Sequence, residues 1–368
     1  MESLDTPPQF NFWRVGNAFD TLIDYFVNVD ASNVGLAASA LQLFDGGKGG
    51  DWFDDFGWWG IAFLRAARHA SLLRVDPTTC LNNSTICWQK MDDNAPLVWE
   101  RADQQTFREA KPRFVGGCWN NYFSLGCDPL TGPGKLCGFQ NTVTNGLYLV
   151  LAARYFQQTG YISYLTAAQR EWRWFLQWFL DPSLHPDERL LDVYTAPSPT
   201  RMLVRERVST YAFWNGKYPP VRAYDKNLNW AGDQGLILGA MVSLISILKD
   251  TSLYNFAIGI LDGIQDRLVD DKGILQPWRP GIDFQGDSPD YSTGMGVYMR
   301  YLLYAFQQDT FLKQYILQTY QPFIQINAEA VCNSIKTCPP LPDGTSIEPM
   351  ECWLNKLAVL NAAIVIGS

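Results

Sequence analysis

The chain has 368 residues, of which 47% are hydrophobic and 18% charged, enough for one large domain or two of ordinary size. Its net charge is −8 and its isoelectric point about 4.9, with no long basic run, which argues against a nucleic-acid partner. We see no apolar run near the roughly 18 residues of a membrane helix, and so expect no membrane span.

The eight cysteines fall into three clusters without a Cys-x-x-Cys pair, and only two histidines are present. This argues against a zinc site, and no cofactor is indicated. Overlapping glycosylation sequons start at Asn82 and Asn83, between Cys80 and Cys87. We therefore expect a secreted or cell-surface protein with most cysteines bridged, first of all Cys80 with Cys87. The first residues lack the apolar core of a signal peptide. We expect that a signal peptide was removed, with a cytosolic protein that has free thiols as the alternative.

Apolar residues recur at helical spacing along most of the chain, and the pattern predicts a series of helices. They are expected at Val15–Val29, from Asp54 to about Leu73, Thr142–Gln158, Tyr161–Leu180, Asn229–Leu248, Thr251–Val269, Tyr291–Gln308, Thr310–Glu329 and Glu348–Ile366. An irregular, Cys-bearing region follows Leu73, with a short candidate helix at Leu97–Thr106. The Pro-punctuated segment Asp187–Asp225 is a long excursion or a short hairpin.

These helices come mostly in consecutive hairpins, without a linker long enough to separate domains. Such a chain closes best as an all-α toroid of helical hairpins in a single domain over residues 1–368, with a single-layer α-solenoid as the alternative. In a toroid, the loops at one end of the hairpins line a central cleft.

A pair of acidic residues, Asp54 and Asp55, stands out among large aromatic residues. Asp51 is a plausible N-cap, which places the pair in the first turn of a helix, where the helix dipole favours carboxylates. Phe53, Phe56, Trp58 and Trp59 surround the pair. The alternative is ordinary helix-start charges followed by core aromatics.

Two other acidic pairs serve as internal comparisons. Asp92-Asp93 and Asp270-Asp271 have Lys, Asn or Gly beside them, which is typical of a helix cap and a turn. Only the pair at 54 and 55 opens an aromatic helix, so it is the candidate site.

Other reaction classes find less support in the sequence. The glycine-rich run 46–50 lacks the order of a phosphate-binding loop and no strand precedes it. No Gly-x-Ser-x-Gly motif occurs, and His69 and His185 have no clear nucleophile nearby. A carboxylate enzyme remains, and glycoside hydrolysis needs one ionised and one protonated carboxyl group close together.

The segment Trp52-Phe-Asp-Asp-Phe-Gly-Trp-Trp closely resembles the Asp-Asp-x-x-Trp-Trp motif of glycoside hydrolase family 76, the endo-α-1,6-mannanases. Further blocks resemble the family in the same order: Gly116-Gly-Cys-Trp119, Asn141-Thr-Val-Thr-Asn145, Asp233-Gln-Gly and, more weakly, Gly294-Met-Gly-Val-Tyr-Met-Arg300. The resemblance covers most of the chain from about Val15.

The resemblance implies an (α/α)6 barrel and a retaining mechanism, with Asp54 as the nucleophile and Asp55 as the acid/base. It implies an endo-acting enzyme that cuts α-1,6-mannan, and we expect a monomer. A transglycosylase of the same family and a binding-only relative are the alternatives. The sequence departs from the family at Gly232-Asp233, where the family has Tyr-Asn, and at Thr293-Gly294, where it has Lys-Gly.

Six further residues are expected to bind the sugar. Trp58 and Trp119 are candidate platforms, with core packing as the alternative. Asn141, Asn145, Asp233 and Gln234 are candidate contacts to hydroxyl groups, with helix capping as the alternative for Asn145 and Asp233. Arg300 is either part of the site or a structural ion-pair residue.

Overall fold

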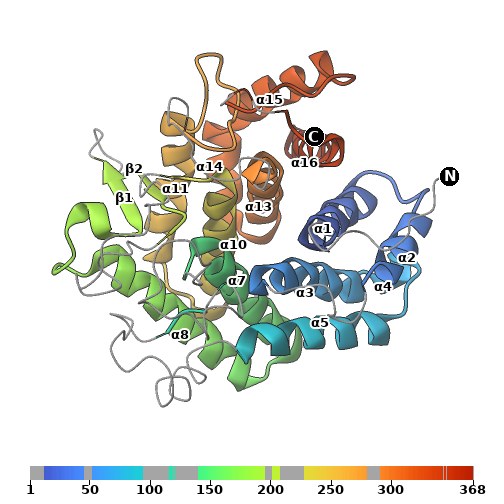
Figure 1. Cartoon of the computed structure of the whole chain (residues 1–368), viewed down its shortest axis with the longest axis horizontal. Helices are drawn as coiled ribbons and strands as arrows, with labels where there is room; N and C mark the ends of the chain where they lie inside the picture. Colours follow the sequence, from blue (N-terminus) through green and yellow to red (C-terminus); the bar gives the residue numbers. More distant parts are fainter. Residues whose placement is uncertain are drawn as a thin grey trace, which may run out of the picture.

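Six helices of the computed structural model form a closed inner ring. The structure describes residues 12–44, 52–93, 116–118, 120, 140–194, 201–207, 228–279, 291–342, 344 and 346–367. Each inner helix packs against the next, and the last packs against the first (Figure 1). They are α1 (Phe12–Asn28), α3 (Phe53–Arg68), α7 (Thr142–Thr159), α10 (Ala231–Leu248), α13 (Gly294–Gln308) and α16 (Pro349–Gly367). The chain is an (α/α)6 barrel, as expected.

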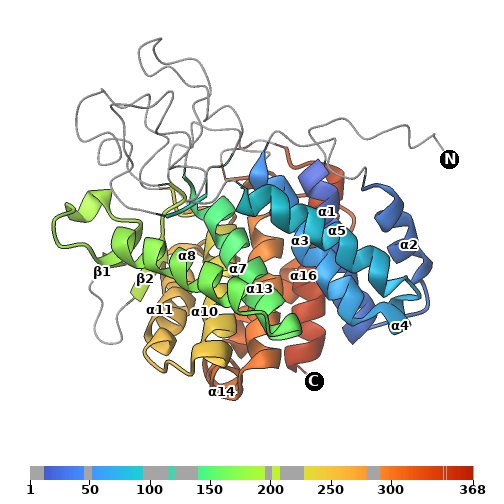
Figure 2. The same ribbon diagram turned by 90° about the horizontal axis from the view of Figure 1, so that it is seen from below.

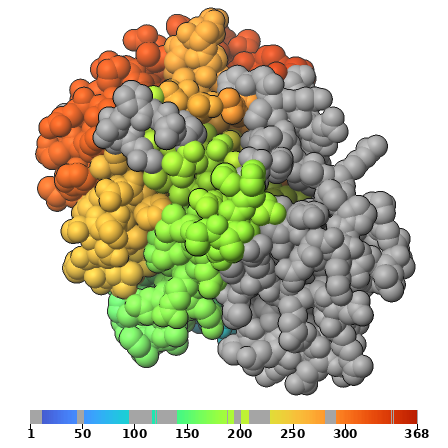
Figure 3. Space-filling model, turned by 90° about the vertical axis from the view of Figure 1, so that its left-hand side faces the viewer, coloured from blue at the N-terminus to red at the C-terminus, as the bar shows by residue number. Residues whose placement is uncertain are grey.

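A second layer of helices covers the ring from outside. These helices are α2 (Gly35–Gln42), α4 (Ala70–Leu73), α5 (Pro77–Asp92), α8 (Ile162–Leu180), α11 (Leu253–Arg267), α14 (Thr310–Thr319) and α15 (Gln321–Asn333). A 3₁₀ turn, η3 (Pro186–Glu188), precedes an antiparallel hairpin of β1 (Leu191–Tyr194) and β2 (Arg201–Val204), in which Leu191 pairs with Val204. The hairpin lies between α8 and α11 on the outer face seen in Figure 3.

Two expectations about the helices were wrong, and one helix was missed. The region after Leu73 is not irregular, because Asp76 caps α5 by accepting from two backbone N–H groups and Pro77 occupies its first turn. The helix expected over Thr310–Glu329 is divided at Tyr320, and the first turn of α15 contains a proline. The helix α2 was not predicted. The candidate helix at Leu97–Thr106 lies outside the described residues.

The inner helices α7 and α10 are buried on nearly every side, because the neighbouring inner helices and the outer layer enclose them. Two of the inner helices, α10 and α16, are long and apolar enough to cross a membrane by length and composition, so the expectation that no run reaches this length was wrong. In the barrel, 83% of the α10 window and 50% of the α16 window are buried. Their place in the inner ring accounts for the apolar composition.

The inner helices all start at the same end of the barrel. Arg14, in the first turn of α1, forms an ion pair of 2.6 Å with Glu351 in the first turn of α16. The ring of Trp13 lies 6.3 Å from that of Trp58 in α3. The last turns of the six helices line a common cavity at the other end, where the C-terminus lies in Figure 2. Side chains in the first turns therefore converge on one mouth of the barrel.

A buried ion-pair network ties α1, α3 and α13 together inside the ring. Arg65 binds Asp20 at 2.5 Å and also binds Asp24. Arg300 donates to the backbone oxygen of Asn17 at 2.6 Å and lies 3.7 Å from Asp20. Burial would raise the pKa of Asp20, but the guanidinium groups around it, Arg65 first, hold that pKa below its usual value. Arg300 is thus a structural ion-pair residue.

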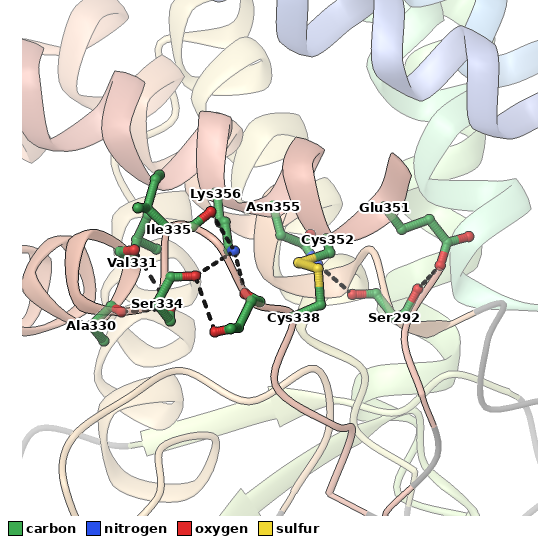
Figure 4. The surroundings of a disulfide bond; sticks show 11 residues. Ser292, Ala330, Val331, Ser334, Ile335, Cys338, Glu351, Cys352, Asn355 and Lys356 are labelled. Carbon is green, nitrogen blue, oxygen red and sulfur yellow. Dashed lines mark hydrogen bonds between the residues drawn. A yellow bond between two sulfur atoms is a disulfide. The ribbon is translucent and has the colours of Figure 1, made fainter. Parts of the chain in front are cut away.

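The predicted pairing of Cys80 with Cys87 was wrong, since both thiols are free and buried in α5. Seven residues of helix separate their Cα atoms by about 10 Å along the axis, and a disulfide needs less than about 7 Å. Among the described residues the structure has one disulfide, between Cys338 and Cys352 (Figure 4).

The disulfide joins the loop after α15 to the first turn of α16, and Lys356 of α16 reinforces the joint. Its Nζ donates to the backbone oxygens of Ser334 at 2.7 Å and Thr337 at 2.5 Å (Figure 4). The cation thereby satisfies carbonyl groups at and just beyond the end of α15. Desolvation lowers the pKa of Lys356.

Candidate active site

The structure places Asp54 and Asp55 in the first turn of α3, as predicted. Asp55 is buried and Asp54 is half-buried, while Phe53 and Phe56 beside them are fully buried. The N-cap position is taken by Trp52 in an extended conformation, and Asp51 lies outside the described residues. The first turn of an inner helix brings both carboxylates to the mouth where all the inner helices start.

The turn that carries the two carboxylates is held by a neighbouring segment. The backbone N–H of Phe53 donates to the oxygen of Asn120 at 2.8 Å. Cys118, two residues before Asn120, is hydrogen-bonded to the side-chain amide of Asn145 in α7. The amide accepts from the N–H of Cys118 at 2.5 Å and donates to its oxygen at 3.1 Å. Asn145 of α7 therefore holds Cys118, and Asn120, two residues further along the chain, holds the start of α3.

The amide group of Asn145 binds backbone groups of two segments. Its side chain is fully buried, and its Nδ2 also donates to the oxygen of Asn141 at 2.6 Å. The helix cap is Asn141, whose Oδ1 accepts from the N–H of Thr144 at 3.2 Å. The capping alternative thus applies to Asn141, and Asn145 holds the neighbouring segment instead.

The two glycines of the Gly-Gly-x-Trp block have a steric reason. Gly116 and Gly117 both have positive φ values, of 113° and 79°. A Cβ atom on Gly117 would lie 2.5 Å from Nε1 of Trp174 and 2.7 Å from Nε2 of Gln140. Gln140 in turn donates to the oxygen of Gly116 at 2.9 Å. Only glycine fits here, so the motif shapes the segment that leads to Trp119. Trp119 itself lies outside the described residues.

Trp58 is packed into the barrel and is only 3% exposed. Its ring contacts Trp13, and the guanidinium carbon of Arg300 lies 5.9 Å from the ring centroid. This burial favours the packing alternative over a sugar platform.

A second polar cluster gathers at the starts of α7 and α10, centred on Glu206. The Glu206 carboxylate accepts from Arg207 at 2.6 Å, from Tyr291 at 3.1 Å and from Asn141 at 3.5 Å. Its side chain is 2% exposed. Sequence reasoning missed Glu206, because it follows β2 in a segment without regular periodicity. A local indication of a buried charged group was nevertheless present, since Glu206 lies between Arg205 and Arg207 directly after the apolar residues of β2.

Asp233 lies beside this cluster in the first turn of α10 and is fully buried. Neither of its carboxylate oxygens has a hydrogen-bond partner in the described part of the chain. Burial, together with the charge of Glu206, raises the pKa of Asp233 well above its usual value, and Arg207 opposes this only in part. This environment favours the protonated form of Asp233, which can donate a hydrogen bond.

Gln234 grips the neighbouring strand as Asn145 grips its segment. Its Oε1 accepts from the N–H of Val204 at 2.7 Å, and its Nε2 donates to the oxygen of Val204 at 2.7 Å and of Trp230 at 3.0 Å. The side chain is fully buried, so its amide positions β2. The three helix starts bring Asp54, Asp55, Asn141 and Asp233 to one mouth, with α7 between α3 and α10.

The fold is shared with solved structures of low sequence identity. The Lin0763 protein of Listeria innocua aligns with a TM-score of 0.68 and 15% identity over 97% of this chain and 86% of that protein. An inactive variant of the α-1,6-mannanase GH76A of Salegentibacter sp. HEL1_6, in complex with α-1,6-mannotriose, aligns with a TM-score of 0.63 and 15% identity over 97% of this chain and 90% of that one. Dfg5 of Chaetomium thermophilum, in complex with glucosamine, gives a TM-score of 0.61 and 14% identity over 96% and 80%.

A curated sequence relative points the same way. The chain is 24% identical over 274 residues to the mannan endo-1,6-alpha-mannosidase DCW1 of Candida albicans. The resemblance to glycoside hydrolase family 76 is confirmed. The alignment covers 70% of this chain and 49% of DCW1, so the chain spans about half the length of this curated relative. No family model matches the chain.

Proposed function

We propose that this protein is a retaining, endo-acting glycoside hydrolase that cleaves α-1,6-mannan, in which Asp54 is the nucleophile and Asp55 the acid/base. The observation that carries the proposal is the pair of adjacent carboxylates in the first turn of α3, at the mouth of the barrel. The Salegentibacter mannanase supports it, because its inactive, mannotriose-bound variant has two adjacent aspartates replaced by asparagine.

The spacing of the two carboxyl groups supports a retaining mechanism. Adjacent Cα atoms are about 3.8 Å apart, and neighbouring helical side chains diverge by about 100°. Such short side chains do not easily open the roughly 6.5–9.5 Å gap that an inverting enzyme needs for its water, whereas roughly 5–5.5 Å is within their reach. Asp54 would attack the anomeric carbon while Asp55 protonates the leaving oxygen.

The acid/base must change its protonation state during the cycle. While Asp54 is ionised, its negative charge favours the protonated form of Asp55. Once the mannosyl ester forms, that charge disappears, and Asp55 ionises to activate water. Asp233 and the Glu206 cluster would face the sugar as hydrogen-bonding groups, and Trp119 remains a candidate platform.

Incubation with α-1,6-mannan, followed by mass spectrometry and proton NMR of the products, tests the proposal. Shorter oligosaccharides released first as the α-anomer are expected. Initial appearance of the β-anomer would refute the retaining roles. Longer products would indicate a transglycosylase of the same family, and unchanged mannan would indicate a binding-only relative.

The disulfide between Cys338 and Cys352 supports a secreted or cell-surface location. We also propose that residues 1–368 form one catalytic domain.

A further inference from the structure

A cavity of about 1560 Å³ opens at the end of the barrel opposite Asp54 and Asp55. The last turns of the six inner helices line it, together with Lys313 of α14. The helix α3 spans the distance between the two ends, since it begins beside Asp54 and its last residue, Arg68, lines the cavity. Fourteen helical residues make the separation about 21 Å, so this cavity is distinct from the candidate active site.

The lining of the cavity is cationic in a protein whose net charge is −8. Four cations face it, and no aspartate or glutamate is among its lining residues. The cations are Arg65, Arg68, Arg154 and Lys313. Several glutamine side chains and Tyr304 supply neutral hydrogen-bonding groups. This combination suits a polar ligand that carries negative charge.

Helix dipoles explain part of this charge but not all of it. Arg65 and Arg68 are in the last turn of α3, where cations offset the negative end of the dipole. Arg65 is moreover neutralised by Asp20 and Asp24. The remaining cations need another explanation, and Arg154 is the clearest case.

Arg154 is nine-tenths buried, and in the described part of the chain it has no ion-pair partner. Its Nε makes no hydrogen bond, and its guanidinium carbon lies 4.3 Å from the centroid of the Tyr304 ring. The charge of Arg154 acts on the buried carboxylate of Asp20 from beyond ion-pair distance, and burying a guanidinium without a carboxylate in direct contact is costly. A stacked guanidinium that lines a cavity keeps its free N–H groups in a fork that matches a phosphate group.

We propose that this cavity binds a phosphate-bearing ligand, with the phosphate on Arg154 and with the rim cations Arg68 and Lys313 adding to the positive charge of the cavity. Arg68, Arg154 and Lys313 make no ion pair in the described part of the chain, and this positive charge favours a doubly charged phosphate over a single carboxylate. The cavity is much larger than a phosphate ion, so a phosphorylated sugar fits it, with its hydroxyl groups on the glutamine side chains.

Isothermal titration calorimetry of the whole chain with inorganic phosphate, glucose 6-phosphate and glucose tests this site. We expect glucose 6-phosphate to bind with a dissociation constant of about 1 mM or below, and glucose not to bind here. Tighter binding of inorganic phosphate than of glucose 6-phosphate would support the oxyanion site and identify the free ion as its ligand. No binding of either phosphate compound at about ten times that concentration would overturn the proposal.

Variants locate the binding. Arg154→Gln should weaken binding at least tenfold. Because Arg154 is buried, the double variant Arg68→Gln/Lys313→Gln on the exposed rim provides a second test that does not disturb the core, with an expected loss of about threefold or more. Lys272→Gln, an exposed change of the same charge outside the cavity, should bind as the original chain does. Unchanged affinity in both the Arg154 and the rim variants would place any phosphate site elsewhere and refute the inference.

Discussion

Asn145 and Gln234 occupy equivalent positions in α7 and α10, each as the fourth residue of its helix, and each holds both backbone groups of one residue in a neighbouring segment. Asn145 holds Cys118 and Gln234 holds Val204. Each amide also donates to the backbone oxygen four residues earlier. Asn145 and Gln234, which the sequence suggested as sugar contacts, therefore hold the segments beside the candidate site in place.

Asn145→Ala should destabilise the protein by about 2–5 kcal/mol, because it leaves two buried backbone groups of Cys118 without partners. Urea unfolding measures this. Asn255→Ala, at an exposed position of α11, is the matched control and should change stability by less than about 0.5 kcal/mol. If Asn145→Ala weakened mannan binding with the stability unchanged, Asn145 would be a sugar contact after all.

Asp54→Asn and Asp55→Asn should each lower turnover of mannan by about 10³-fold or more, because each removes a carboxyl group to which the proposed mechanism assigns a direct role. Circular dichroism and the unfolding midpoint should stay close to those of the original chain. The control is Asp271→Asn, an exposed member of another acidic pair. Near-normal turnover in Asp54→Asn would end the assignment of that residue as the nucleophile.

Asp233→Asn should leave the fold intact and should raise stability more at pH 8 than at pH 4. The pKa of Asp233 is raised in the folded protein, so its protonated form stabilises the fold at low pH and this contribution is lost as pH rises above the unfolded-state value of about 4. The amide side chain of the variant does not titrate, so the stability of the variant lacks this pH dependence. Unfolding free energies of both proteins across this pH range provide the measurement. An equal effect at both pH values would show that Asp233 is ionised in the folded state.

Glu171→Gln should flatten the pH dependence of stability between about pH 4.5 and pH 8. Burial raises the pKa of Glu171 to about 8, although Arg170 and a backbone N–H of Gly117 oppose the shift. The folded state holds a proton here that the unfolded state releases, so stability falls by up to about 1.4 kcal/mol for each pH unit in this window. The variant should match the original chain near pH 4 and exceed it at pH 8. Parallel pH profiles for the two chains would contradict this.

Cys338→Ser should lower the free energy of unfolding by about 3 kcal/mol, since the disulfide closes a loop with a sequence separation of 14 residues. Thermal unfolding with and without reductant gives the same comparison in the original chain. Cys332→Ser removes an exposed free thiol nearby and should have little effect. Equal midpoints with and without reductant would mean that the bond contributes nothing to the fold.

The barrel could be predicted well from the sequence because the pattern that indicates a helix depends only on residues close together in the chain. The hairpins Thr142–Leu180 and Asn229–Arg267 follow from apolar periodicity and turn residues a few positions apart, and their bounds in the structure agree within a few residues. The same holds for Asp54 and Asp55, whose position in a first turn depends on nearby residues only. The start of α5 is also encoded locally, by Asp76 followed by Pro77, but this helix was not predicted.

Long-range partners were not predictable in this way. The sequence suggested Asn145 and Gln234 as polar residues near a site, but nothing local indicates that Cys118 and Val204 meet their amides. Glu206 and Arg154 acquire their significance only when α7, α10 and α13 are brought together. The failure of the Cys80–Cys87 pairing has the same origin, because spacing in sequence says little about separation until the helix is known.

The contact between α16 and α1 sets the time at which the molecule can be completed. Asn361 donates to the backbone oxygen of Thr21 across 340 residues, and the first turns of the same two helices share the ion pair of Arg14 with Glu351. A ribosome adding about 5–20 residues per second needs roughly 20–70 s to make the intervening chain. During that time the apolar sides of α1 and α13 that α16 will cover have no native partner. Protection of the nascent chain against aggregation must therefore last until its final helix has emerged.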